Sequence, residues 1–234
     1  MTSTAIIPAF NEQGRIENVI NTVRHADDVS EIIVVADGST DNTPAIAESL
    51  GAKVVRHERN LGKGAAMLTG SAAAINESLL FLDADVSTFT AEDINKITDK
   101  LNEGYDFVKT HFQRDSGRVT QLTVRPLLKR FFPEVFERFP EPLSGQIGIT
   151  KSALNSVVVA RDYGVDIALL LDLYKKGAKI AAVEINWLKH RHHDLARLHN
   201  MALQVSREIL ARIDDATFNS GKSAVSDELS LVRE

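Results

Sequence analysis

Short apolar runs alternate with amphipathic stretches along the first half of the chain. The runs that predict buried strands are 4–7, 31–35, 53–55, 79–82 and 106–110. The stretches between them show helical spacing or helix-start signals, which predicts helices over 15–24, 41–50, 61–74 and 91–101. Strands that alternate with helices are typical of a parallel, doubly wound sheet with right-handed crossovers. The pattern therefore predicts an α/β fold.

The pattern loosens after residue 110. An apolar and basic stretch over 120–132 predicts a helix that ends at Pro133, and a loop with two further prolines and Gly145 follows it. The remaining predicted elements are a strand at 147–149, a buried helix at 165–173, a strand at 180–185 and a long amphipathic helix at 196–213. We therefore expect one domain over residues 1–218, followed by a flexible polar tail over 219–234.

Composition narrows the class of protein. The chain has 234 residues, no cysteine and a net charge of −5. The absence of cysteine excludes disulfides and thiol chemistry, and the negative charge argues against a nucleic-acid partner. Neither a secretory signal nor a run of roughly 18 apolar residues is present, which argues against membrane insertion. We expect a soluble, cytoplasmic protein.

The apolar run 79–82 leads into Asp83-Ala84-Asp85. Ligands of open α/β sheets bind outside the carboxyl ends of the strands, so these two carboxylates lie where a ligand is expected. If the strand continued through them, both side chains would point the same way. Mg²⁺ favours one or two carboxylates together with substrate phosphates, so the pair suggests a site for a metal-bound diphosphate. The alternative is a solvated, acidic turn.

Polar groups follow the other predicted strands as well. Residues 8–12 (Pro-Ala-Phe-Asn-Glu) follow the first strand, Asp37 the second and Lys63 the third. A nucleotide could use backbone groups of 8–10 for its base, a carboxylate for its ribose and Lys63 for its phosphates. A helix cap at 11–12 and a flexible turn at 62–64 are the plainer interpretations. The chain lacks Gly-x-Gly-x-x-Gly and Walker patterns, which disfavours dehydrogenases and P-loop NTPases.

Taken together, these motifs resemble the family 2-type nucleotide-sugar glycosyltransferases of the GT-A fold. The resemblance rests on Pro8-Ala9-Phe10-Asn11-Glu12, Asp37-Gly38-Ser39-Thr40-Asp41, Gly62-Lys63-Gly64 and Asp83-Ala84-Asp85, in that order. It implies a Rossmann-like, mostly parallel sheet flanked by helices, with a C-terminal acceptor-binding region and a long final helix. It also implies a nucleotide-sugar-binding half over 1–112 and an acceptor-binding half over 113–218.

The second half of the chain resembles a narrower group, the glucosyl-3-phosphoglycerate synthases. The matching segments are Gly117-Arg118-Val119-Thr120, Arg125-Pro126-Leu127-Leu128, Pro142-Leu143-Ser144-Gly145-Gln146, Tyr163-Gly164-Val165-Asp166 and Lys189-His190-Arg191. These are retaining enzymes that move glucose from a nucleotide donor to the 2-hydroxyl of 3-phosphoglycerate. UDP-glucose is the favoured donor, while mannosyl transfer and glycerate as acceptor remain open.

The resemblance also implies roles for individual residues. Asp85 and His190 would hold Mg²⁺ or Mn²⁺. The residues implied at the donor are Pro8, Ala9, Phe10, Glu12, Asp37, Lys63, Asp83 and Ala84. Those implied at the sugar and the acceptor are Arg118, Thr120, Arg125, Leu143, Ser144, Gly145, Gln146 and His192. Asp83, Asp166 and Arg191 would take part in catalysis, with Arg191 or Lys63 adding positive charge at the leaving group.

Local chemistry favours several of these roles, and each has an alternative. Arginine forks suit an acceptor with a phosphate and a carboxylate, and Arg118 and Arg125, seven apart, would share a face of one helix. Both could instead be solvated surface residues. A neutral imidazole at His190 is a common metal ligand, although runs of histidine also occur on plain surfaces. Asp166 lies in an apolar stretch, where it would need a partner or serve as a helix N-terminal acid.

Three positions depart from the narrower group. Asp166 is shorter than the group's glutamate, Gln146 replaces a glutamate, and His192 stands where an asparagine is expected. Other functions therefore stay open: a polyprenyl-phosphate sugar transferase, a nucleotidyltransferase and a non-catalytic nucleotide-sugar-binding module. From the resemblance and the long final helix we expect a homodimer.

Overall fold

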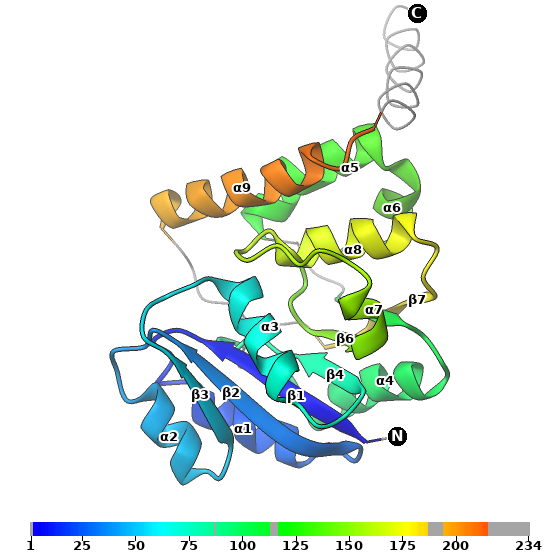
Figure 1. The fold of residues 1–234 in the computed structure, drawn as a ribbon. Coiled ribbons are helices and arrows are strands. Elements are labelled where there is room, and N and C mark those ends of the chain that lie inside the picture. Colours follow the sequence, from blue (N-terminus) through cyan, green and yellow to red (C-terminus); the bar gives the residue numbers. More distant parts are fainter. Residues whose placement is uncertain (1, 87, 113–116, 187–193, 215–234) are drawn as a thin grey trace, which may run out of the picture.

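The computed structural model describes residues 2–86, 88–112, 117–186 and 194–214. In this part of the chain, seven strands form one sheet in the order β3-β2-β1-β4-β6-β5-β7 (Figure 1). They are β1 (Ser3–Ala9), β2 (Val29–Asp37), β3 (Lys53–His57), β4 (Ser78–Phe81), β5 (Phe107–His111), β6 (Ile147–Thr150) and β7 (Ile180–Glu184). Neighbouring strands are parallel except where β6 pairs with β4 and β5. This confirms the predicted mostly parallel sheet.

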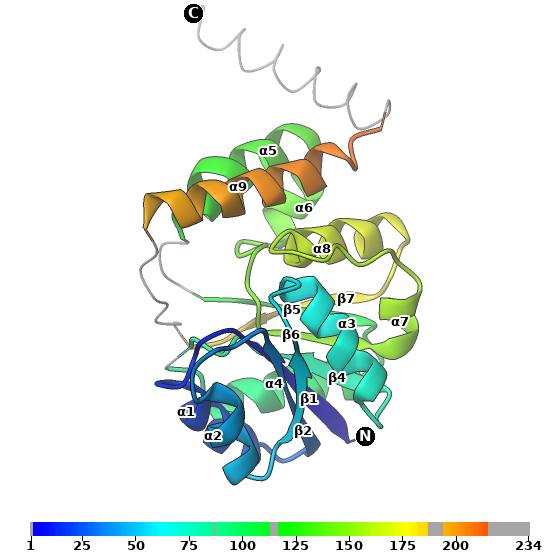
Figure 2. The ribbon, with the colours of Figure 1, turned by 60° about the vertical axis from the view of Figure 1, so that its left-hand side comes forward.

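Helices cover both faces of the sheet. One face carries α1 (Ile16–Arg24), α2 (Thr43–Ser49) and α4 (Ala91–Asn102). The other carries α3 (Lys63–Ala73), α7 (Lys151–Asn155), α8 (Val165–Lys175) and, farther out, the π-helical turn η1 (Thr120–Val124), α5 (Arg125–Phe131), α6 (Pro133–Arg138) and α9 (Leu195–Leu210). Figures 1 and 2 show α5 and α9 side by side beyond α8.

The two faces of the sheet form two separate hydrophobic cores. Side chains of a strand alternate between the faces, so Ile6 packs with α3 residues such as Met67, while Ile7 packs with α1 residues such as Ile20. Burial on both faces explains why the strands read as continuous apolar runs. Among the described helices, none combines the length and the apolar character needed to cross a membrane.

Two element ends add detail to the sequence pattern. β4 ends at Phe81, so Asp83 and Asp85 lie beyond the strand, and the condition under which both side chains would point the same way is not met. The helix predicted over 120–132 is confirmed as a helical stretch that ends at Phe131, just before Pro133, but it begins with the π-helical turn η1, which α5 follows. Pro133 then begins the short helix α6. Proline suits the first helical position because the missing N–H has no intrahelical partner there.

Candidate active site

Asp37, the last residue of β2, holds the loop that leads into α3. Its carboxylate accepts hydrogen bonds from the backbone N–H groups of Leu61 (2.8 Å) and Gly62 (2.9 Å), and lies 2.6 Å from Nδ1 of His57. Gly62 has φ +101°, and a Cβ there would lie 2.5 Å from the carbonyl oxygen of Arg161, so only glycine fits. Asp37 is 4% exposed and thus acts through the loop that presents Lys63.

Lys63, at the start of α3, lies between two carboxylates. Its Nζ is 2.8 Å from Oδ1 of Asp83 and 2.8 Å from Oδ2 of Asp166. Burial alone would lower the pKa of Lys63, but the negative charges of Asp166 and Asp83 outweigh it and raise the pKa above its ordinary value. The raised pKa favours the charged ammonium, and this ammonium supplies the partner that the buried Asp166 needs.

The loop 142–146 packs against this ion cluster. A Cβ on Gly145 would lie 2.1 Å from Oδ2 of Asp83 and 2.5 Å from Nζ of Lys63, so a larger residue would displace these two side chains or the loop. Gln146 is fully buried, and its Oε1 accepts a hydrogen bond from the backbone N–H of Asp83 (3.2 Å). Segments far apart in sequence thus meet around Lys63: the turn after β4 that carries Asp83, helix α8 with Asp166, and this loop.

Two atoms of this cluster are buried without a hydrogen-bond partner. They are Oδ1 of Asp166 and Nε2 of Gln146. Buried polar atoms are normally paired, so an acceptor and a donor are left available close to the cluster. Hydroxyl groups of a bound sugar could satisfy both kinds of atom.

The turn after β1 is held to the segment after β2. The backbone N–H of Asn11, a residue with φ +57°, donates to Oγ of Ser39 (3.1 Å), and the Oδ1 of Asn11 accepts from the N–H of Thr40 (2.9 Å). The N–H of Glu12 donates to Oγ1 of Thr43 (2.8 Å). Phe10, which adjoins these hydrogen bonds, is 43% exposed. Pro8 and Ala9 are the last residues of β1, so they lie at the carboxyl end of this strand, where the turn begins.

The predicted acceptor residues lie around η1. Thr120 is buried within η1, whereas Arg118 is exposed just before it. Nη1 of Arg125 donates to the carbonyl oxygen of Pro140 (3.2 Å), and its guanidinium lies 4.7 Å from the centre of the Phe136 ring. The π-helical turn lies between the two arginines, so the seven-residue spacing of a regular α-helix does not apply to them.

A family model described as "Glycosyl transferase family 2" matches residues 4–164, which is more than half of the chain. The chain belongs to glycosyl transferase family 2. The matched region contains the strand-end residues and the loop 142–146 described above. It confirms the family to which the sequence motifs pointed.

Relatives within this family share most of the chain. A glucosyl-3-phosphoglycerate synthase from Mycobacterium tuberculosis is 33% identical over 238 residues, covering 90% of this chain and 73% of the relative. One from Petrotoga mobilis is 30% identical, covering 80% of this chain and 64% of the relative. The crystal structure of the M. tuberculosis enzyme in complex with Mn²⁺, UDP and glucosyl-3-phosphoglycerate matches with a TM-score of 0.85 and 34% identity, over 91% of this chain and 80% of that chain. This likeness confirms the predicted GT-A fold.

The acidic turn of this family 2 chain fits a hard divalent cation. Asp85 follows Asp83 and the buried Ala84, and carboxylate oxygens together with substrate phosphates are the ligands that Mg²⁺ and Mn²⁺ prefer. Within the described ranges, no three acidic or histidine side chains gather into a metal site. The other predicted ligand, His190, lies outside the described residues, as do Arg191 and His192.

Two features of the site were not predicted from the sequence. Lys63 was expected at the donor phosphates, and its pairing with Asp166, 103 positions away, has no signal in the sequence. Lys109 is 1% exposed in β5, and only its place inside an apolar run could have drawn attention to it. Ser144, which is predicted to line the substrate pocket, is 6% exposed, and its hydroxyl lies 2.5 Å from Oγ1 of Thr110.

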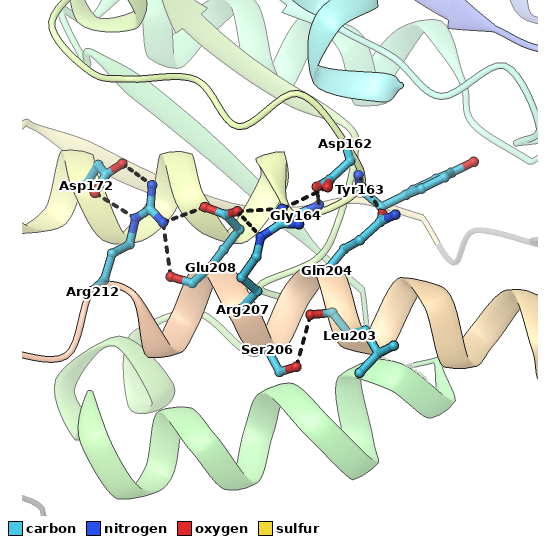
Figure 3. A network of polar contacts seen from close by, with 10 residues as sticks. All are labelled: Asp162, Tyr163, Gly164, Asp172, Leu203, Gln204, Ser206, Arg207, Glu208 and Arg212. Carbon is cyan, nitrogen blue, oxygen red and sulfur yellow. Dashed lines mark hydrogen bonds and ion pairs between the residues drawn. The ribbon is translucent and has the colours of Figure 1, made fainter. Parts of the chain in front are cut away.

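Helix α9 forms ion pairs with α8 and with the segment that precedes α8 (Figure 3). Arg207 of α9 lies 2.7 Å from Oδ2 of Asp162, and Arg212 binds Asp172 of α8. The neighbouring Arg161 accepts a hydrogen bond at its carbonyl from the N–H of Ala65 (2.9 Å) in the first turn of α3. The C-terminal helix therefore braces the segment against which Lys63 is placed.

Proposed function

We propose that this chain is a retaining, metal-dependent glycosyltransferase that transfers glucose from UDP-glucose to the 2-hydroxyl of 3-phosphoglycerate, giving glucosyl-3-phosphoglycerate. One observation carries the proposal. The chain shares 34% identity and a TM-score of 0.85 with a synthase whose crystal structure contains Mn²⁺, UDP and this product. The cluster of Lys63, Asp83 and Asp166 supports it, because it provides charged groups at the edge where a nucleotide-sugar donor is expected.

On the donor side, the turn after β1 is the proposed nucleotide site. The exposed ring of Phe10 and the backbone of Pro8 and Ala9 offer a stacking surface and hydrogen bonds to a base. Glu12 and Asp37 are the proposed carboxylates near the ribose, with Asp37 acting through the loop that it holds. Ala84 adds a backbone contact in the acidic turn.

The sugar is proposed to lie against the ion cluster. Asp83 and Asp166 accept hydrogen bonds from sugar hydroxyls, and the unpaired Oδ1 of Asp166 and Nε2 of Gln146 support this placement. Asp166 is ion-paired to Lys63, which makes its carboxylate a poor nucleophile toward the anomeric carbon. Retention then fits a route on one face of the sugar. The anomeric carbon–phosphate oxygen bond breaks, the acceptor oxygen bonds to that carbon, and the leaving phosphate oxygen takes the acceptor's proton.

A divalent cation is proposed at Asp85 and His190. Bound there, Mg²⁺ or Mn²⁺ would neutralise negative charge on the diphosphate. This chain's own cations, Lys63 and Arg191, add positive charge near the same leaving group. Asp85 belongs to the same turn as Asp83, so the cation would lie close to the residues proposed to hold the sugar.

The acceptor is proposed to bind across the second half of the chain. Arg118 and Thr120 would hold its phosphate and carboxylate, with Arg125 and His192 nearby. The loop residues Leu143 to Gln146 would close the pocket, with Ser144 acting through its backbone. This assignment divides the chain into a donor half over 1–112 and an acceptor half over 113–218, followed by the tail over 219–234.

We also propose that two copies of this chain form a dimer and that the protein acts in the cytoplasm. Helix α9 supports the first part, because Leu195, Leu203 and Leu210 on it are exposed by 76%, 55% and 52%. Exposed apolar groups of this size on one long helix are typical of an interaction surface.

Release of nucleoside diphosphate tests the function. The pure protein is given Mg²⁺ or Mn²⁺ with UDP-glucose or GDP-mannose, each with 3-phosphoglycerate, glycerate or no acceptor. We expect release that needs UDP-glucose, 3-phosphoglycerate and the cation, and that falls at least about 100-fold in Arg118→Ala. The matched control is Arg24→Ala, which removes an exposed arginine from α1, away from the site. Release that ignores the acceptor, or none with any combination, would contradict the proposal.

A further inference from the structure

Lys109 is buried in the sheet, at a position where an apolar side chain would cost less free energy to bury. It lies in the middle of β5, opposite Ile147 of β6 and Ala182 of β7, and is 1% exposed. Burial lowers the pKa of Lys109 to about 8, with Lys63 acting in the same direction and Asp166, Asp83 and Glu141 opposing it. The core alone gives no reason for an ammonium here, since apolar side chains of similar volume are often as stable or more so.

The ammonium of Lys109 binds the backbone of the loop 142–146. Its Nζ donates to the carbonyl oxygen of Ser144 at 2.6 Å. The next residue, Thr110, donates from its hydroxyl to the carbonyl oxygen of Gln146 (2.7 Å), which leaves its Oγ1 to accept from the hydroxyl of Ser144. Two consecutive residues of β5 thus hold the backbone on both sides of Gly145.

Gly145 lies in close contact with the ion cluster. Its α-carbon faces both the carboxylate of Asp83 and the ammonium of Lys63, and a methyl group added there would displace one of them. A shift of the loop therefore changes the space available to these two side chains. Reactive groups tolerate displacements of about 1 Å poorly, because transfer depends on their alignment.

We propose that Lys109 is a positioning residue, whose buried ammonium fixes the loop 142–146 and thereby places Gly145 against Asp83 and Lys63. It acts through the carbonyl of Ser144. The catalytic part of this proposal rests on the proposed function. The contact between Lys109 and the loop does not depend on that function. The two parts are tested by separate measurements.

Amide hydrogen exchange tests the hold on the loop without any substrate. In Lys109→Met, we expect amides of the loop 142–146 to exchange at least about tenfold faster than in the wild type, because the Ser144 carbonyl loses its donor. The matched control is Lys53→Met in β3, which removes an exposed lysine that also donates to a backbone carbonyl, that of Ala73 (2.7 Å). Exchange in the loop that is unchanged in Lys109→Met would overturn the proposal.

Chemical rescue separates the ammonium from simple packing. The chain contains no cysteine, so Lys109→Cys introduces its sole thiol. Alkylation of the unfolded variant with 2-bromoethylamine, followed by refolding, restores an ammonium at nearly the length of lysine. Alkylation with 1-bromopropane gives a side chain of the same length without the charge. We expect the aminoethyl form, and not the propyl form, to recover slow exchange in the loop.

Kinetics then test the catalytic part. We expect the propyl form to lose at least about tenfold in kcat while its KM for UDP-glucose changes by less than about threefold, and the aminoethyl form to recover kcat. Equal recovery by both forms would show that Lys109 only fills space, and would overturn the proposal. If the wild type itself transfers no glucose, the proposed function fails, and the exchange measurement still decides the hold on the loop.

Discussion

At the scale of single residues, the ammonium of Lys63 decides the electrostatics of the site. It lies between Asp83 and Asp166, of which the second is 4% exposed. A buried carboxylate that loses its ion-pair partner is costly, because solvent does not reach it to compensate the charge. The sequence showed that Asp166 would need a partner but could not name it, since the pairing depends on how α3 and α8 pack.

The first prediction concerns this ion pair. Lys63→Met should lower the free energy of unfolding by about 3 kcal/mol, because it leaves Asp166 without its cation. Asp166→Asn should offset part of that loss, so the double variant should be more stable than Lys63→Met alone. Urea unfolding of the two single variants and the double variant measures the coupling.

The control for this cycle is an exposed pair. Lys100→Met removes a cation that binds Glu103 at the surface, where such pairs contribute less than about 1 kcal/mol. Strictly additive effects of Lys63→Met and Asp166→Asn would show that the two groups do not interact in the folded protein.

The second prediction concerns pH and Lys109. The pKa of Lys109 is lowered from 10.5 to about 8 in the folded protein, so between these values the unfolded chain binds more protons than the folded one. Stability from this group therefore rises with pH across that window, by about 3 kcal/mol at most. The unfolding free energy of the wild type minus that of Lys109→Met should increase from pH 7.5 to pH 10. A difference independent of pH would contradict the lowered pKa.

At the scale of elements, strands and helices followed from the apolar pattern, whereas their ends did not. The sequence left open whether the strand runs through Asp83, and β4 stops at Phe81. The π-helical turn η1, which packs against α9, has no signal in the local sequence pattern. Strand ends carry the candidate site, which is why its residues could be named from the sequence while their contacts could not.

The third prediction concerns the loop between α6 and β6. Gly145→Ala places a methyl group 2.1 Å from Oδ2 of Asp83 and 2.5 Å from Nζ of Lys63, so the loop or these two side chains must shift. We expect kcat to fall about 100-fold, since reacting groups are displaced. Gly14→Ala is the matched control, because a Cβ at Gly14 has no neighbour within 4 Å. Steady-state rates with UDP-glucose and 3-phosphoglycerate compare the two, and normal activity of Gly145→Ala would contradict the geometry of the loop.

At the scale of the whole molecule, the sheet brings together residues from both halves of the chain. Asp83 comes from residues 1–112, Gln146 and Asp166 come from residues 113–218, and the three meet around Lys63. Periodicity and motifs in the sequence predicted these segments one by one. How these segments meet depends on long-range packing, including the antiparallel β6 between β4 and β5, which the sequence pattern did not show.

The fourth prediction concerns assembly. If the exposed leucines of α9 form an interface, light scattering should give about twice the chain mass of 25.7 kDa. The double variant Leu203→Glu and Leu210→Glu should then give a monomer, because like charges would face each other in the interface. Ile75→Glu, at another exposed apolar residue, is the control and should leave the mass unchanged. A monomeric wild type would contradict the proposed dimer.

The structure of the product tests the central claim most directly. UDP-glucose labelled with ¹³C at the anomeric carbon is incubated with 3-phosphoglycerate, a divalent cation and the pure protein, and the product is followed by NMR. The account predicts one product in which the labelled carbon is joined to the 2-oxygen of 3-phosphoglycerate in the α configuration of the donor. A β-linked product would contradict retention, and labelled free glucose or unchanged donor would contradict transfer to 3-phosphoglycerate itself.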